Sequence, residues 1–448
     1  MWYTNQKYES VRIRRQKYDK GRKRMKTWLI RGAKVVDPSQ NLEDIQDILI
    51  KDGKIKEIST NIFDEHAEII QADGLVAAPG LVDMHVHLRD PGQTHKEDIQ
   101  SGCQSAAAAG VTSLACMPNT SPACDSPAVV EDILRKAADA KARVYPVAAV
   151  SASLAGRELT DFAALQKAGA VALSDDGRPV PTAGLMAEAM ERAARLGMPV
   201  LSHCEDLSLV RGGVMNEGAV SRELGVPGIH RGAEEVATAR EIALAAATGC
   251  PVHICHVSTA GSVALLRDAK RRGVPVTGET APHYFALTDA CLRTRDADYR
   301  MNPPLRTEAD RLAVIEGLQD GTLRAIATDH APHAPEEKAD FLKAPNGAIG
   351  METSLAAGLT YLVKPGYLSL ARLIECLSTW PAELLRIPGG TLKPGAAADL
   401  ALFDPNKEWT VDVRSLHGKS RNCCFKGLTL TGQVLYTFLG GDLVFRRG

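Results

Sequence analysis

Short apolar runs alternate with alanine-rich segments through the middle of this 448-residue chain. The runs have strand length, whereas the segments between them have the longer spacing of apolar residues that is typical of amphipathic helices. About eight strand–helix units in a row predict an α/β fold with a parallel (β/α)8 barrel, a TIM barrel, over residues 79–387. The predicted strands cover residues 75–84, 111–116, 144–150, 170–174, 199–202, 252–255, 274–277 and 324–328.

Both flanks of this region have a different pattern, with short strands and turns. Residues 27–78 contain an Asp52-Gly53 turn between two apolar runs, which is a hairpin signal. Residues 388–448 return to the same pattern after Pro388-Gly389-Gly390. We expect the two ends of the chain to pair into one small β-sandwich domain that flanks the barrel.

Residues 1–26 are rich in lysine and arginine and poor in apolar residues. This pattern predicts a disordered basic extension, or upstream sequence outside the natural product with Met25 as an alternative start. A nucleic-acid-binding arm is the alternative interpretation.

The composition narrows the function classes. A net charge of -1 and 5% aromatic residues argue against a nucleic-acid-binding protein. No apolar run has the length of a membrane span, and no hydrophobic signal region follows the basic start. Ten irregularly spaced cysteines without a C-x-x-C pair indicate reduced thiols rather than a disulfide scaffold, which favours a cytoplasmic protein.

A His-x-His pair lies at the end of the first predicted barrel strand. Side chains two residues apart on a strand point to the same side, so His85 and His87 project together and can hold one divalent ion. Arg89 is next in the same series, where its guanidinium can bind a carboxylate with two hydrogen bonds.

Further histidines and aspartates follow later predicted strands. Each one alone is explained by a helix cap, a turn or a core histidine, but a parallel barrel brings the ends of all its strands to one rim. Six nitrogen and oxygen ligands suit Zn²⁺ and are enough for two ions, with a bridging carboxylate between them. The candidate ligands are His85, His87, Asp175 or Asp176, His203, His256 and Asp329.

The ligand pattern resembles the amidohydrolase superfamily, and four motifs resemble the dihydroorotases of the long, bacterial kind (class I). The resemblance runs from about residue 28 to the end of the chain. The motifs are HLRDPG at 87–92, MPNT at 117–120, MNPPLR at 301–306 and DHAPH at 329–333.

This resemblance implies a hydrolase of pyrimidine biosynthesis that cyclises N-carbamoyl-L-aspartate reversibly to dihydroorotate with a metal-bound hydroxide. It assigns His85 and His87 to one Zn²⁺, and His203 and His256 to a second. Asp176 is the expected bridge, with Asp175 as the alternative, and Asp329 is the expected general acid and base. The cofactor is one or two zinc ions, with two expected.

The resemblance also implies a set of substrate contacts. Arg89, Asn119 and His333 are expected to bind the substrate carboxylate, and Asn302 a carbonyl or carbamoyl group. His87 is included among the substrate-binding residues. Asn346 and Gly347 match a loop that contacts substrate through its backbone, although the family often has phenylalanine at the position of Asn346.

Two alternatives remain at this stage. The first is another cyclic amidohydrolase, such as a hydantoinase or allantoinase, against which the three carboxylate-binding candidates argue. The second is an inactive dihydroorotase-like partner of aspartate transcarbamoylase, a class that usually loses metal ligands. The expected partner is the small-molecule substrate; a homodimer and a complex with aspartate transcarbamoylase are candidates between which the sequence does not decide.

Overall fold

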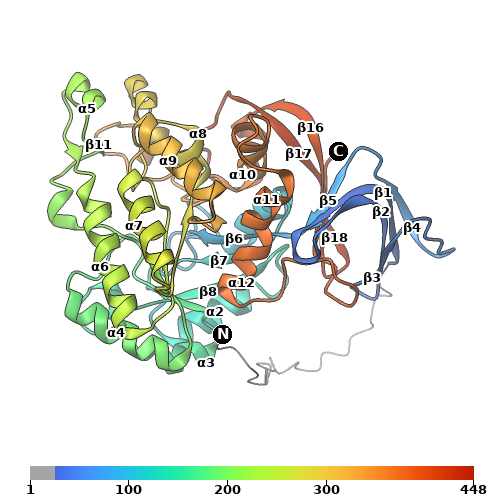
Figure 1. Ribbon diagram of the computed structural model, residues 1–448, viewed down its shortest axis with the longest axis horizontal. Coiled ribbons are helices and arrows are strands. Elements are labelled where there is room, and N and C mark those ends of the chain that lie inside the picture. The colour runs from blue at the N-terminus through green and yellow to red at the C-terminus, as the bar shows by residue number, and fades with distance from the viewer. Residues whose placement is uncertain (1–25) are drawn as a thin grey trace.

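The computed structural model describes residues 26–448, and its centre is a parallel barrel (Figure 1). Eight strands pair in the order of the sequence, each parallel to the next. A parallel bridge between Val86 and His330 brings the first strand beside the segment after the last, which confirms the predicted barrel. The strands are β6 (Leu81–Val86), β7 (Val111–Cys116), β8 (Arg143–Ala149), β9 (Ala172–Ser174), β10 (Val200–Ser202), β13 (Val252–Ile254), β14 (Val276–Thr280) and β15 (Ala325–Ile326).

Helices cover the outside of the barrel (Figure 1). Sequence signals define their ends: Thr182 caps the start of the fourth helix with its side chain, and Gly197 ends that helix at φ 66°. The helices are α1 (Ile99–Ala108), α2 (Pro127–Lys136), α3 (Phe162–Ala168), α4 (Ala183–Leu196), α5 (Ala219–Leu224), α6 (Gly232–Thr248), α7 (Ala260–Arg271), α8 (Pro282–Ala286), α9 (Glu308–Gln319), α10 (Met351–Gly358), α11 (Leu370–Ile374) and α12 (Trp380–Leu385).

Strands from both ends of the chain form one sheet beside the barrel (Figure 1). The ends meet where β5 pairs antiparallel with β16. The predicted hairpin at Asp52-Gly53 is present, and both residues have the positive φ that its turn requires. The strands are β1 (Trp28–Asp37), β2 (Leu42–Lys51), β3 (Lys54–Ser59), β4 (Glu68–Gln71), β5 (Val76–Pro79), β16 (Leu400–Thr410), β17 (Thr429–Leu439) and β18 (Asp442–Arg446).

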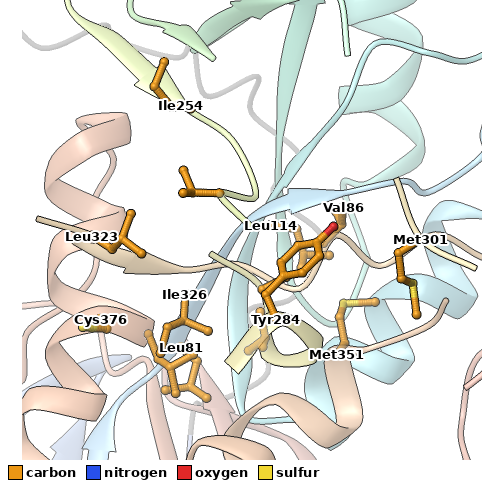
Figure 2. Close-up of a cluster of buried hydrophobic side chains, with 14 of the residues drawn as sticks. Leu81, Val86, Leu114, Ile254, Tyr284, Met301, Leu323, Ile326, Met351 and Cys376 are labelled. Carbon is orange, nitrogen blue, oxygen red and sulfur yellow. The ribbon is translucent and has the colours of Figure 1, made fainter. Parts of the chain in front are cut away.

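The largest apolar core fills the space between the barrel strands and the helices. Figure 2 shows a part of it, in which Tyr284 of α8 lies among side chains from β6, β7 and α10. A separate cluster of mostly small side chains fills the barrel interior, and Ala382 and Leu385 of α12 pack against it. Because side chains fill the interior, we look for a site at the rim of the barrel.

The structure bears on several further predictions from the sequence, and leaves some of them untested. The basic segment 1–26 lies outside the described residues, apart from Lys26. The boundaries at residues 79 and 387 remain a prediction, which limited proteolysis would test. All ten cysteines are free thiols in the described part of the chain. No helix within residues 26–448 combines the length and the hydrophobicity needed to cross a bilayer.

Candidate metal centre and active site

A cavity of about 210 Å³ opens at the carboxyl ends of the barrel strands. All seven substrate-binding candidates from the sequence line it, together with four of the other candidate ligands. His85 is fully buried beneath it. The residues that line the cavity are His87, Arg89, Asn119, Asp176, Gly177, His203, His256, Asn302, Asp329, Ala331, His333, Asn346 and Gly347.

A first group of ligand atoms joins the beginning and the end of the barrel. The Nε2 atoms of His85 and His87 lie 3.7 and 3.0 Å from Oδ1 of Asp329. The carboxylate of Asp176, at the end of β9, lies 3.3 Å from the Nε2 atom of His85 and 3.6 Å from that of His87. Four side chains from three places in the sequence therefore surround one point.

A second group shares the same carboxylate. Nδ1 of His203, after β10, lies 2.8 Å from Nε2 of His256, after β13. Oδ1 of Asp176 lies 3.5 Å from the first of these nitrogens and 3.7 Å from the second. Asp176 therefore lies between the two groups, as a bridging ligand must.

These atoms fit a metal centre. Ligand nitrogens 2.0–2.1 Å from a tetrahedral zinc ion are about 3.3 Å apart, and the measured separations scatter around that value. Within residues 26–448, His85 Nε2 and Asp176 Oδ1 are buried without a hydrogen-bond partner. Buried polar atoms without partners are costly, and a cation between them removes that cost.

The adjacent aspartate has a different environment. Oδ1 of Asp175 accepts hydrogen bonds from the backbone N–H groups of Val150 and Ser151, and Oδ2 accepts one from the Ser151 hydroxyl. Asp175 therefore ties the end of β9 to the segment after β8, whereas Asp176 faces the histidines.

Three of the four histidines have a partner on the ring nitrogen that faces away from the ligand groups. Nδ1 of His85 lies 2.9 Å from Glu279, and Nδ1 of His87 lies 2.8 Å from the Asn119 side-chain oxygen. Nε2 of His203 lies 3.3 Å from Glu205. Such partners fix the orientation and the tautomer of a ligating imidazole.

An irregularity in the backbone of β6 determines the direction of the His85 side chain. Val82 and Met84 belong to the barrel-interior cluster and Val86 to the outer core, so the alternation along β6 is interrupted near His85. The pairing of β6 with β7 has a register shift there, and bulges of this kind redirect side chains beside active sites.

Three site residues have left-handed backbone conformations, which side chains other than glycine adopt at a cost. The φ angles are 59° at Arg89, 37° at His256 and 50° at Asp329. The residue before the third of them is anchored to the first barrel strand: Thr328 donates its backbone N–H and its hydroxyl to the buried carboxylate of Asp83 on β6.

The neighbouring histidines favour the ionised form of the two aspartates of the ligand groups by lowering the pKa of each. Burial raises the pKa of each carboxyl, but the neighbouring histidines outweigh it. His85 holds the pKa of Asp176 well below its usual value. A hydrogen bond with His87 and the positive charge that His85 carries when no metal ion is bound lower the pKa of Asp329. An ionised Asp329 can accept a proton at neutral pH.

A second wall of the cavity carries the substrate candidates Arg89, His333 and Asn346, whereas His87 and Asn119 lie with the ligand groups. The Arg89 guanidinium donates to the carbonyl of Pro332 and lies 3.5 Å from Nε2 of His333. His333 Nε2 in turn donates to the carbonyl of Asn346. Burial and the charge of Arg89 lower the pKa of His333 to about 3, so this imidazole is neutral beside a guanidinium cation.

The chain around this wall is held by contacts to its backbone. Lys338 donates to the carbonyls of Pro345 and Gly347. Asn422, after β16, donates to the carbonyls of Ala331 and Gly347 and accepts the backbone N–H of His333. The flanking part of the chain therefore reaches the rim of the barrel.

Sequence reasoning missed four of these residues: Glu205, Glu279, Lys338 and Asn422. A signal existed for Glu279, because a glutamate that ends an apolar strand of a barrel points to the same rim as the ligands. No comparable signal marked Asn422, which lies far along the chain from the residues that it contacts.

Solved structures with this architecture include hydantoinases and a dihydropyrimidinase. The L-hydantoinase (dihydropyrimidinase) of Arthrobacter aurescens is 27% identical, with a TM-score of 0.85 over 95% of this chain and 97% of its own. The dihydropyrimidinase of Brevibacillus agri is 26% identical, with a TM-score of 0.83 over 94% and 95%. Barrel, ligand groups and these likenesses define a hydrolase of the amidohydrolase superfamily.

Sequence comparison is more specific. A family model described as Dihydro-orotase-like matches residues 74–262. The dihydroorotase of Acetivibrio thermocellus is 50% identical over 93% of this chain and 99% of its own length. The dihydroorotase of Geobacter metallireducens is 50% identical over 94% and 99%. The chain belongs to the dihydroorotase family, which confirms the resemblance seen in the motifs.

Proposed function

We propose that this protein is a zinc-dependent dihydroorotase, which interconverts N-carbamoyl-L-aspartate and dihydroorotate with release or uptake of one water. The observation that carries the proposal is the shared cavity: two groups of metal ligands lie on one wall, and Arg89 with neutral His333 lies on the other. A cyclic amide that bears a carboxylate fits between such walls.

Each wall has its own part in the reaction. Arg89, Asn119 and His333 bind the substrate carboxylate, and Asn302 contacts a carbonyl or carbamoyl group. Zinc ions, when bound, supply Lewis acidity for the ring carbonyl and lower the pKa of water. Asp329 takes a proton from the attacking water and gives it to the ring nitrogen as the carbon–nitrogen bond breaks; cyclisation reverses these transfers.

The alternatives are weaker on specific grounds. A hydantoinase has no use for a buried arginine aimed at a substrate carboxylate, and the identity to dihydroorotases is 50%, against 27% for the hydantoinase. An inactive partner protein usually lacks metal ligands, whereas all six candidates of this chain lie together around one cavity.

One assay tests the assignment. The zinc-loaded protein is incubated with dihydroorotate and with hydantoin side by side, before and after removal of the metal with a chelator. We expect turnover of dihydroorotate only, lost on chelation and restored by zinc. Turnover of hydantoin alone would overturn the substrate assignment, and full activity after verified metal removal would overturn the metal dependence.

Assembly and location extend the proposal. The family resemblance supports a homodimer or a complex with aspartate transcarbamoylase, in the cytoplasm. Light scattering of the purified protein, alone and mixed with the aspartate transcarbamoylase of the same organism, distinguishes a monomer, a dimer and a mixed complex.

A further inference from the structure

A buried glutamate lies directly behind the metal centre. Glu279, on β14, is 1% exposed. Its Oε1 atom lies 2.9 Å from Nδ1 of His85 and accepts the backbone N–H of His256 at 3.4 Å. One carboxylate therefore contacts a candidate ligand of the first group and the backbone of a ligand of the second.

In the part of the chain that the structure describes, the ionisable side chains that contact the Glu279 carboxylate are histidines. Its other oxygen, Oε2, lies 3.3 Å from Nε2 of His253, whose Nδ1 lies 2.7 Å from the Thr277 hydroxyl. Among residues 26–448, no lysine or arginine forms an ion pair with Glu279. An anion this deeply buried is unfavourable without a cation near it, so it has a reason to face the metal through an imidazole.

The contact also selects one form of the imidazole. A carboxylate at Nδ1 keeps the proton on that nitrogen and leaves Nε2 with a free lone pair. The Nε2 atom of His85 lies 3.3 Å from Asp176 and 3.7 Å from Asp329, the side chains that would hold the first ion with it. By contrast, His87 has only a neutral amide, that of Asn119, on its Nδ1.

We propose that Glu279 is a positioning residue of the metal centre, which holds His85 in the metal-binding tautomer and balances the charge of the ion across the imidazole ring. The inference rests on the proposed metal-dependent function. It goes further by naming a residue behind the ligands that helps to retain the metal. Glu205 has the same relation to His203 in the second group.

Release of zinc in the absence of substrate tests this role. The zinc-loaded protein is mixed with excess colorimetric chelator, and the rate is followed for the wild type and for Glu279→Gln. The amide keeps the size of the side chain and removes its charge. Loss of an outer partner of a metal ligand typically weakens binding about 10- to 100-fold, so we expect release to be faster by a factor in that range.

Glu234→Gln is the matched control. Glu234 is also buried and accepts backbone N–H groups, from Ser258 and Thr259, but its charged partner is Arg306 and not a histidine. We expect this variant to release zinc at the wild-type rate. We also expect zinc to raise the melting temperature of Glu234→Gln as much as that of the wild type, and that of Glu279→Gln by less.

Glu279→Asp keeps the negative charge and gives a second variant in case the amide does not fold. We expect its release rate to lie between those of the wild type and Glu279→Gln. Wild-type release from both Glu279 variants, or equally fast release from Glu234→Gln, overturns the positioning role. A wild-type protein that retains no zinc overturns the proposed metal-dependent function as well, so the two failures differ.

Discussion

Two walls of the cavity are held in place by different kinds of contact. We call the wall with the two ligand groups the metal wall, and the wall with Arg89 and His333 the substrate wall. On the metal wall, side chains hold side chains: His85 is held by Glu279, His87 by Asn119 and His203 by Glu205. On the substrate wall, Lys338 and Asn422 hold backbone carbonyls of the chain between residues 331 and 347. The metal wall is therefore fixed by the barrel itself, and the substrate wall by irregular chain that depends on the flanking segment.

This difference separates two classes of variant. A change on the metal wall should affect turnover or metal content, because those contacts orient ligands. A change on the substrate wall should raise KM and leave the zinc in place. The predictions that follow test this separation.

Asp329→Asn tests the metal wall at the carboxylate that is proposed to transfer the proton. General acid–base groups contribute about 100- to 10,000-fold to rates, so we expect kcat to fall by a factor in that range while the fold remains intact. Steady-state kinetics measure the fall, and circular dichroism checks the fold. Near-normal turnover would remove the proton-transfer role of Asp329. Zinc content is measured alongside, because Asp329 also belongs to the first ligand group.

Arg89→Met tests the substrate wall at its charge. Methionine keeps most of the volume, and loss of a charge-assisted hydrogen bond costs about 1.5–3 kcal/mol, or about 10- to 100-fold in KM for dihydroorotate. The zinc content should equal that of the wild type. Loss of zinc with an unchanged KM would show that the two walls are not separate.

Asn422→Ala tests the support that the substrate wall receives from outside the barrel. The substitution leaves the carbonyl of Ala331 and the N–H of His333 without their partner, whereas the carbonyl of Gly347 keeps its hydrogen bond from Lys338. We expect KM to rise by about tenfold, the effect of roughly 1.4 kcal/mol, with kcat changed much less. An unchanged KM would assign the order of this wall to the barrel alone.

Lys338→Met has the smallest expected effect, which is a change in how the stability of the protein depends on pH. Burial lowers the pKa of Lys338 from 10.5 to about 8. Between pH 8 and 10 the unfolded chain binds more protons at this lysine than the native protein, so the wild type gains stability relative to Lys338→Met as pH rises. The expected gain is on the order of 1 kcal/mol, measured as the pH dependence of the difference in denaturation midpoint.

Much of the metal wall could be predicted from the sequence, because its residues obey two simple rules. Neighbouring i and i+2 positions on a strand share a side, and the carboxyl ends of barrel strands share a rim. These rules bring His85, His87, His203, His256 and Asp329 together before any coordinates are known.

The remainder depends on details that those rules leave open. Which of Asp175 and Asp176 faces the histidines depends on the backbone of Val150 and Ser151, because Asp175 accepts hydrogen bonds from their N–H groups. Which carboxylate meets which ring nitrogen depends on local shifts of register, as near His85 on β6. The support of the substrate wall by Asn422 joins segments about 90 residues apart, and no periodic pattern reports such a contact.

The junction between β6 and the segment after β15 has a consequence for biosynthesis. His85 and Asp329 are separated by almost the whole length of the barrel in sequence, yet both belong to the first ligand group. A nascent polypeptide on the ribosome cannot assemble this ion-binding site until the eighth strand has emerged and docked beside the first. Capture of an ion by the first ligand group would therefore come late in maturation, and fragments that stop short of the last strand should be unable to acquire activity.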